Sequence, residues 1–344
     1  MKTHRWMVAA LTLVPGARFP SADRAPTVEQ QSSGTTARLQ AVWAVDDRIV
    51  WASGTRGTFS RTTDGGKTWR AGTVPGADSL EFRDVHAFDA RRAVLLAAGP
   101  GDKSRLYYTA DGGDSWTQTF VNQDKARFYD CIDFQGQTGY AVSDAAAGIF
   151  PLLRTTDGGK SWSAWTPAGS ESLAPVDGEG GFAASGTCLT IHNDGSVWIG
   201  TAGGARAIRF SDQGSTAFPT PIVRGQAAGI ASVAFRNATV GIAAGGDLGR
   251  ADAYLDNVAV TEDGGKTWTV AARPPFPGAV FGLAYVPSRP STVVAVSPKG
   301  AAWSDDNGKT WALLDTNDYW GISFTRSGVG WIAGPRGRIA KVTF

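Results

Sequence analysis

Two pairs of acidic residues in this chain could supply the carboxyl groups of a glycoside hydrolase. The pairs are Glu81 with Asp84 and Asp130 with Asp144. Such an enzyme needs one carboxyl as general acid and a second as base or nucleophile. Each of these acids could equally lie in a solvated loop, so residue types alone leave hydrolysis as the alternative function.

The sequence gives little support for a metal site, a redox site or a bound cofactor. The only cysteines are Cys131 and Cys188, and the three histidines show no ligand spacing, so we predict no metal site. The two thiols are expected either as buried apolar groups or as one bridge between neighbouring repeats. The segment 178–183 matches a dinucleotide fingerprint, but no buried strand precedes it and no amphipathic helix follows. We therefore predict no cofactor.

A third group of aspartates is repeated along the chain in the pattern Ser/Thr-x-Asp-x-Gly-x-Ser/Thr-Trp. Asp can accept hydrogen bonds from nearby backbone N–H groups, Gly supplies positive φ, and Trp can anchor the next strand. An aspartate repeated in every unit indicates a structural turn rather than five active sites. The Asp and Trp of the five copies are Asp64 and Trp69, Asp111 and Trp116, Asp157 and Trp162, Asp263 and Trp268, and Asp306 and Trp311.

The spacing of these turns predicts a β-propeller. Successive aspartates are separated by 40 to 50 residues, apart from one double gap that holds a degenerate copy at 210–217. Each interval contains short apolar runs separated by turn residues, which is typical of propeller blades. Aligning the units gives seven first strands, among them 39–43, 128–134 and 182–191. The fold class is therefore all-β, a single seven-bladed propeller.

The seventh unit ends one strand short. The chain stops after 338–344 without an Asp turn or a fourth strand, which would leave an unpaired sheet edge. The spare β-capable segment is Thr27 to Gln31. We predict that this N-terminal segment closes the ring by joining the last blade.

Composition and the amino terminus indicate an exported protein without nucleic-acid affinity. The formal net charge is +2, charged residues make up 19%, and no basic cluster is present. Basic residues precede a short apolar stretch at 6–14 that resembles a signal peptide. We expect a signal peptide over 1–22, a lead-in over 23–38 and the propeller over 39–344. We expect no transmembrane segment, a periplasmic or extracellular location, and a monomer.

These repeats are Asp boxes, also called BNR repeats, and their density resembles the photosystem II assembly factor family known as Ycf48 or HCF136. The runs 80–85, 154–159 and 337–341 are most similar to the bacterial, uncharacterised branch of that family. The resemblance implies a propeller that serves as a binding or assembly platform for another envelope or secreted protein. Sialidases, xyloglucanases and sortilin-type receptors also carry Asp boxes, so an extracellular glycoside hydrolase with a glycan ligand is the alternative. The Arg-Ile-Pro run usual in sialidases is absent.

Propeller geometry also predicts a working surface. Strands alternate in direction, so the turns after the second strands and the approaches to the first strands should share the face opposite the Asp boxes. Charged and aromatic residues of these segments should meet around one mouth of the channel, where they either bind a partner or pair with one another. The predicted set is Glu81, Arg83, Asp84, Arg127, Tyr129, Asp130, Asp144, Glu179, Asp247, Tyr319, Trp320 and Arg336.

Overall fold

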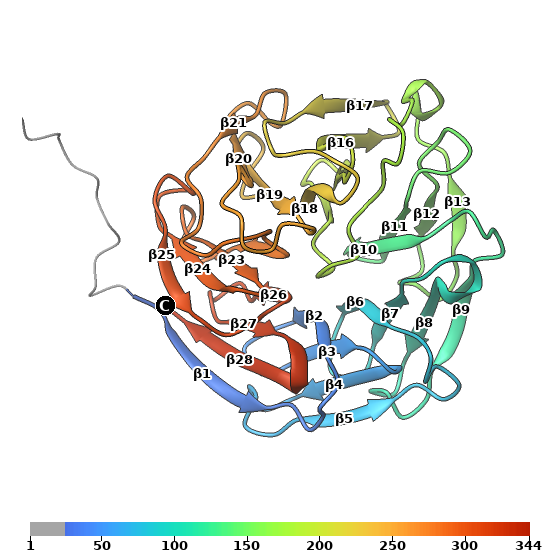
Figure 1. Ribbon diagram of the computed structural model, residues 1–344. Coiled ribbons are helices and arrows are strands. Elements are labelled where there is room, and N and C mark those ends of the chain that lie inside the picture. Colours follow the sequence, from blue (N-terminus) through green and yellow to red (C-terminus); the bar gives the residue numbers. More distant parts are fainter. Residues whose placement is uncertain (1–24) are drawn as a thin grey trace, which may run out of the picture.

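The computed structural model describes residues 25–344, which form seven four-stranded antiparallel sheets arranged around a ring (Figure 1). The predicted seven-bladed propeller is confirmed. The described helices are three short 3-10 turns: η2 (Gly101–Lys103), η3 (Ser170–Ser172) and η4 (Pro335–Gly337). None of them is long and apolar enough to span a bilayer. The expected signal peptide lies outside the described residues.

Each blade runs from an innermost strand at the channel to an outer strand at the rim. The innermost strands are β2 (Leu39–Ala44), β6 (Phe82–Ala87), β10 (Tyr129–Gln135), β14 (Leu189–Ile191), β18 (Ala228–Phe235), β22 (Gly282–Tyr285) and β26 (Gly321–Phe324). The second strands are β3 (Val50–Gly54), β7 (Ala93–Ala97), β11 (Thr138–Ser143), β15 (Val197–Gly200), β19 (Gly241–Asp247), β23 (Val293–Ser297) and β27 (Gly330–Ala333).

The third strand and the rim strand of each blade occupy the two outer positions of its sheet. The third strands are β4 (Thr58–Thr62), β8 (Arg105–Thr109), β12 (Leu152–Thr155), β16 (Arg206–Ser211), β20 (Val258–Thr261), β24 (Gly300–Ser304) and β28 (Arg338–Thr343). The rim strands are β5 (Arg70–Thr73), β9 (Thr117–Val121), β13 (Ser163–Trp165), β17 (Gly214–Pro219), β21 (Thr269–Val270), β25 (Ala312–Asp315) and β1 (Thr27–Ser32).

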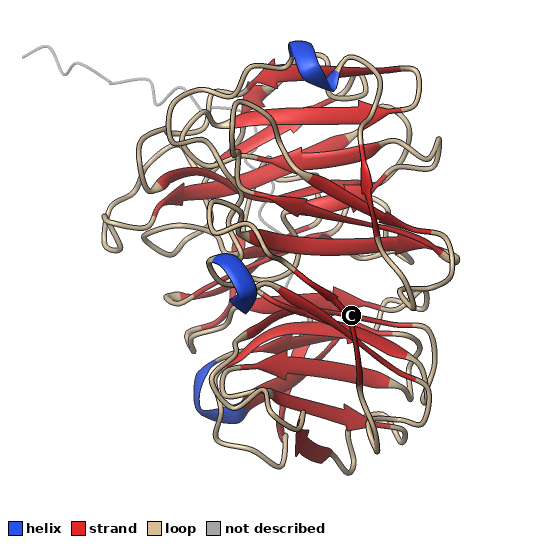
Figure 2. Ribbon diagram, turned by 90° about the vertical axis from the view of Figure 1, so that its right-hand side faces the viewer, coloured by secondary structure: helices blue, strands red, loops and turns tan. Residues whose placement is uncertain are grey.

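Burial explains which sequences occupy which position in a blade. The second strand β23 reads VVAVS and is buried throughout, because neighbouring blades cover both of its faces. The rim strand β5 reads RAGT and is partly or fully exposed. Seen from the side, the strands lie between two layers of loops (Figure 2). We call the layer with the Asp boxes the Asp-box face and the opposite layer, which holds the turns after the second strands, the loop face.

The N-terminal strand closes the ring, as predicted. β1 pairs antiparallel with β28 from Thr27 opposite Thr343 to Ser32 opposite Arg338 (Figure 1). The side chain of Gln31 also joins blades one and seven, because its Oε1 accepts hydrogen bonds from the indole N–H groups of Trp69 at 3.2 Å and Trp331 at 3.1 Å. The first and last parts of the chain therefore hold the final blade together.

The Asp boxes are hydrogen-bonded turns between the third and rim strands. In the third blade, Asp157 accepts bonds from the backbone N–H and the hydroxyl of Ser161, at 3.0 and 2.6 Å, and from the hydroxyl of Thr155. These donors lower the pKa of Asp157 to about 2 against the opposing effect of burial. The same pattern recurs at Asp64, Asp111, Asp263 and Asp306.

We expect Asp157→Ala to lower the free energy of unfolding by about 1 to 2 kcal/mol, because several turn donors lose their acceptor. The matched variant is Asp212→Ala in the degenerate copy, whose carboxylate accepts one hydrogen bond from the described residues, from the Trp165 indole N–H at 3.2 Å. Denaturant unfolding of both variants should show the smaller loss at Asp212. Equal losses would contradict the view that the Asp box stabilises its turn.

The fourth unit departs from the sequence prediction. A first strand was expected over 182–191, but only Leu189–Ile191 forms strand β14. The residues before it cross the channel instead, and we call Gly180–Cys188 the plug. Ser185 donates to the carbonyl of Phe281 at 2.7 Å, and the carbonyl of Thr187 accepts from the N–H of Val233 at 3.1 Å. The plug thus contacts blades five and six across the ring, which a local sequence pattern cannot reveal.

A disulfide fixes the end of the plug. Cys131 in β10 and Cys188 are bridged, with a Cα–Cα distance of 6.1 Å, and both are buried. The sequence is compatible with either two free thiols or a bridge. The structure decides it, because the plug brings Cys188 against the innermost strand of blade three.

Candidate functional site

The twelve residues predicted to surround the channel mouth divide into buried and accessible groups. Tyr129, Asp130, Asp84, Glu179 and Tyr319 are each less than 5% exposed. Side chains so deeply buried cannot contact a docked partner in this conformation. The remaining seven are partly or fully accessible: Glu81, Arg83, Arg127, Asp144, Asp247, Trp320 and Arg336.

The two tyrosines belong to the packing of the blades. The ring of Tyr129 meets Phe120 edge-on at 5.4 Å, and burial raises the pKa of its hydroxyl. Tyr319 donates to Asp315 at 2.9 Å and accepts from Gln30 at 2.7 Å, so it links blade six to the closing strand. Burial raises the pKa of Tyr319 as well. Their expected role in an exposed binding surface does not fit these positions.

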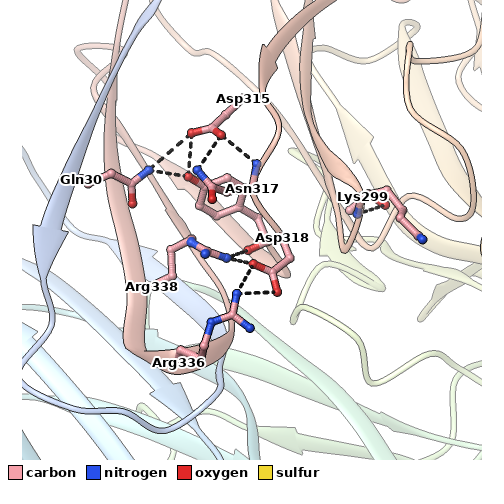
Figure 3. Close-up of polar contacts among 9 residues, drawn as sticks. Gln30, Lys299, Asp315, Asn317, Asp318, Arg336 and Arg338 are labelled. Atoms are coloured by element: carbon pink, nitrogen blue, oxygen red, sulfur yellow. Dashed lines mark hydrogen bonds and ion pairs between the residues drawn. The ribbon is translucent and has the colours of Figure 1, made fainter.

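Arg336 does lie at the surface, but it is paired. It donates to both oxygens of Asp318, at 3.1 and 3.4 Å (Figure 3). Arg338 contacts the same carboxylate from the adjoining strand. Arg127 pairs with Asp124 at 3.1 Å, and Asp247 accepts the N–H of Gly249. Arg127, Asp247 and Arg336 make these local contacts and are not joined to the cluster described next.

Several predicted residues do form one accessible cluster, where the innermost strands of blades six, seven, one and two begin. Glu81 accepts hydrogen bonds from Arg38 at 3.2 Å and from Arg83 at 2.8 Å. The Arg38 guanidinium lies 4.7 Å from the ring centre of Trp320, and the edge of Phe281 meets that ring at 5.0 Å. We call Arg38, Glu81, Arg83, Phe281 and Trp320 the mouth cluster.

Arg38 and Phe281 were missed by sequence reasoning. Arg38, Glu81, Phe281 and Trp320 each stand immediately before an innermost strand, at the positions before β2, β6, β22 and β26. This shared register places them at the channel mouth. Comparing that one position across all repeats would have identified the two missing residues.

The acidic pair Asp130 and Asp144 lies against the plug. Asp144 accepts the N–H of Gly181 in the plug at 2.8 Å, and Asp130 is buried, with no hydrogen-bond partner for its Oδ2 among the described residues. Catalytic carboxyls of glycosidases must contact the sugar that lies between them, and the buried Asp130 is not accessible to one. Burial, and then the charge of Asp144, raises the pKa of Asp130.

Two other predicted acids stabilise the fold around the channel. Asp84 accepts backbone N–H groups of Val85 and Ile132 at 2.7 Å each, and so bridges blades two and three. Glu179 is fully buried and pairs with Arg206, whose Nε lies 2.8 Å from the carboxylate. Thr201 donates a further bond to Glu179 at 2.6 Å. These carboxylates hold the backbone beside the plug rather than face an open cleft.

The channel beneath the plug is open toward the Asp-box face. A cavity of about 360 Å³ is lined there by the ends of innermost strands, including Trp43, Phe235 and Tyr285. The His86 ring packs against Trp43 at a tilt of 38°, with ring centres 4.1 Å apart, and burial lowers the pKa of His86 to about 3, so it is neutral at pH 7. The nearby Asp133 carboxyl has a pKa raised by burial to about 6. No group of three or more metal-ligating side chains occurs among residues 25–344.

Exposed apolar side chains add to the accessible part of the loop face. Within the described chain, six large hydrophobic residues are classed as exposed. Four of them lie in loop-face segments: Ile149 at 42%, Val176 at 44%, Leu248 at 39% and Tyr254 at 55% exposed. The other two, Val270 and Leu313, lie on rim strands. The loop face therefore combines apolar loops with the charged and aromatic mouth cluster.

Fold and site together define a seven-bladed Asp-box propeller with a plugged channel and one face rich in accessible aromatic, apolar and arginine side chains. Residues 302–313 match the model of the BNR/Asp-box repeat. No curated protein sequence matches the chain.

Solved structures of other propellers match this fold along nearly the whole length of the chain. A structure of YCF48 bound to D1 peptide is 20% identical, with a TM-score of 0.66, and the match covers 95% of this chain and 100% of that one. YCF48 from Cyanidioschyzon merolae is 17% identical over 91% of this chain and 98% of its own, with a TM-score of 0.63. A structure of streptogramin B lyase is 13% identical, with a TM-score of 0.67, and the match covers 94% of this chain and 99% of that one. The chain thus has the fold of a Ycf48-like BNR propeller, as the sequence resemblance implied.

Proposed function

We propose that this protein is exported and uses its loop face to bind a segment of another envelope or secreted protein, as an assembly or stability platform. The observation that carries the proposal is that four of the six exposed large hydrophobic residues of the described chain lie in loops of that face, because exposed apolar surface marks protein interaction sites. The mouth cluster adds arginine and tryptophan, the residue types enriched where binding energy concentrates.

Two further facts support the proposal. The structural neighbour YCF48 was solved with a D1 peptide bound, so a propeller of this shape can hold a peptide. The Cys131–Cys188 bridge suits an oxidising compartment, where disulfides persist. We expect the mature protein in the periplasmic or extracellular fraction, with its amino terminus near residue 23, and intact-mass measurement checks this.

The binding face is tested by a pair of double variants. We expect Leu248→Asp with Tyr254→Asp to abolish recovery of the partner from the envelope fraction, because charge replaces two exposed apolar contacts on the loop face. The control is Val270→Asp with Leu313→Asp. These two rim-strand residues are each 50% exposed, close to the exposure of Leu248 and Tyr254. Melting temperature should stay unchanged in both. Full recovery by the loop-face variant, or equal loss in the control, would contradict the proposal.

A further inference from the structure

A pocket opens between blades three and four on the Asp-box face, away from the proposed protein-binding face. Its volume is about 400 Å³, within the range of small-molecule sites. Tyr140 and Arg154 of blade three form one wall, and Arg209 and the short turn that holds Asp212 form the other.

The equivalent position between blades one and two is filled. Trp51 and Arg61 pair across β3 and β4 as Tyr140 and Arg154 pair across β11 and β12. There the Asp box of blade two covers the site, because Trp116 packs edge-on against Trp51 with ring centres 6.2 Å apart. The Arg61 guanidinium also donates to the carbonyl of Ala90 in blade two. The second Asp box therefore leaves no room for a ligand.

Loss of the Asp box in the fourth repeat leaves Arg154 uncovered. The turn there is reduced to two residues, since Ser211 pairs directly with Gly214. Ser215 precedes the strand partner of Arg209 just as Trp69 precedes the partner of Arg61, so a serine stands where the other copies carry tryptophan. Arg154 forms no hydrogen bond or ion pair with any residue of the part that the structure describes, and its buried Nε has no acceptor. Its one described contact is the ring of Tyr140, 5.8 Å from the guanidinium.

The other charged groups of the pocket already have partners. Arg209 pairs with Asp194 at 3.0 Å, and Asp212 accepts the Trp165 indole N–H. With two carboxylates beside two guanidinium groups, the pocket is close to neutral and carries a single uncommitted cation. Such a site suits a singly charged carboxylate better than a doubly charged phosphate, because the neighbouring acids repel the second charge.

We propose that this pocket binds a small hydroxylated carboxylic acid of the size of a uronic acid, with Arg154 holding the carboxylate. The side-chain amides of Gln135 and Gln213 and the hydroxyl of Thr138 also line the pocket and can pair with ligand hydroxyls. The pocket results from the repeat pattern of this chain. An intact Asp box in blade four would fill the pocket, as the Asp box of blade two fills the equivalent position.

The test uses D-galacturonate as probe and isothermal titration calorimetry as readout. We expect the acid to bind the full-length mature protein with a Kd below about 1 mM, neutral galactose not to bind, and inorganic phosphate to bind more weakly. Arg154→Gln should weaken galacturonate binding roughly 10- to 100-fold, since one charge-assisted bond to the carboxylate is lost. Its melting temperature should be unchanged, because the Arg154 side chain makes no hydrogen bond or ion pair with a described residue. Arg326→Gln, an exposed arginine on the same face in the turn between β26 and β27, should bind as the wild type does.

A second variant tests the origin of the pocket. Ser215→Trp places an indole at the position of the missing tryptophan and should block binding by filling the space. Absence of galacturonate binding at concentrations up to about 10 mM would overturn the proposal. Wild-type affinity in Arg154→Gln, or tighter binding of phosphate than of the acid, would overturn it as well.

Discussion

Removal of Thr27–Ser33 should abolish the cooperative thermal unfolding transition of this protein or lower its melting temperature steeply. The deletion takes away the six residue pairs between β1 and β28 and exposes the edge of β28. It also removes Gln31, which accepts indole hydrogen bonds from blades one and seven, and Val28, which packs on the core of the last blade. We expect aggregation on heating, because an open ring presents an unpaired strand.

Melting and light scattering of the deletion variant give the measurement. Glu29→Ala serves as the control, since Glu29 is exposed on the same strand and its loss should leave the transition in place. A synthetic peptide with the sequence of residues 26–33, added in excess, should restore part of the lost stability by pairing with β28. An unaltered transition in the deletion variant would show that another segment closes the ring.

Replacement of both Cys131 and Cys188 by Ala should cost about 4 kcal/mol of unfolding free energy. The bridge joins residues 57 positions apart, so its loss frees a long loop in the unfolded chain. It should also loosen the plug, because Cys188 is its C-terminal anchor. Denaturant unfolding measures the first effect, and amide hydrogen exchange at Gly181 and Val233 measures the second.

Reductant supplies an internal comparison for the cysteine variant. Under denaturing conditions that expose the bridge, reduction should destabilise the wild-type protein to about the level of the double variant and leave the variant unchanged. Equal unfolding free energies for wild type and variant without reductant would contradict a stabilising role. Unchanged amide hydrogen exchange at Gly181 would show that the disulfide does not restrain the plug.

The sequence by itself determined the number of blades, the Asp-box turns and the closing strand. These features depend on local chemistry: Thr155, Asp157 and Ser161 bond to one another within one turn, so their spacing is visible in the chain. Closure followed from counting strands, because a seventh blade without a rim strand needs one from elsewhere and Thr27–Gln31 was available.

Only the tertiary structure decided the chemistry of the channel and its two faces. Tyr129 and Tyr319 fall in segments that the sequence places at the mouth, yet neighbouring packing buries both. The plug was predicted as a strand, because its apolar run at 182–191 fits one locally, while its real partners Phe281 and Val233 lie far along the chain. Arg154 likewise has the same local setting as Arg61, and it is left open because the adjoining blade lacks the turn that would cover it. Burial and pairing across blades depend on contacts between distant repeats, and a pattern within one repeat does not contain them.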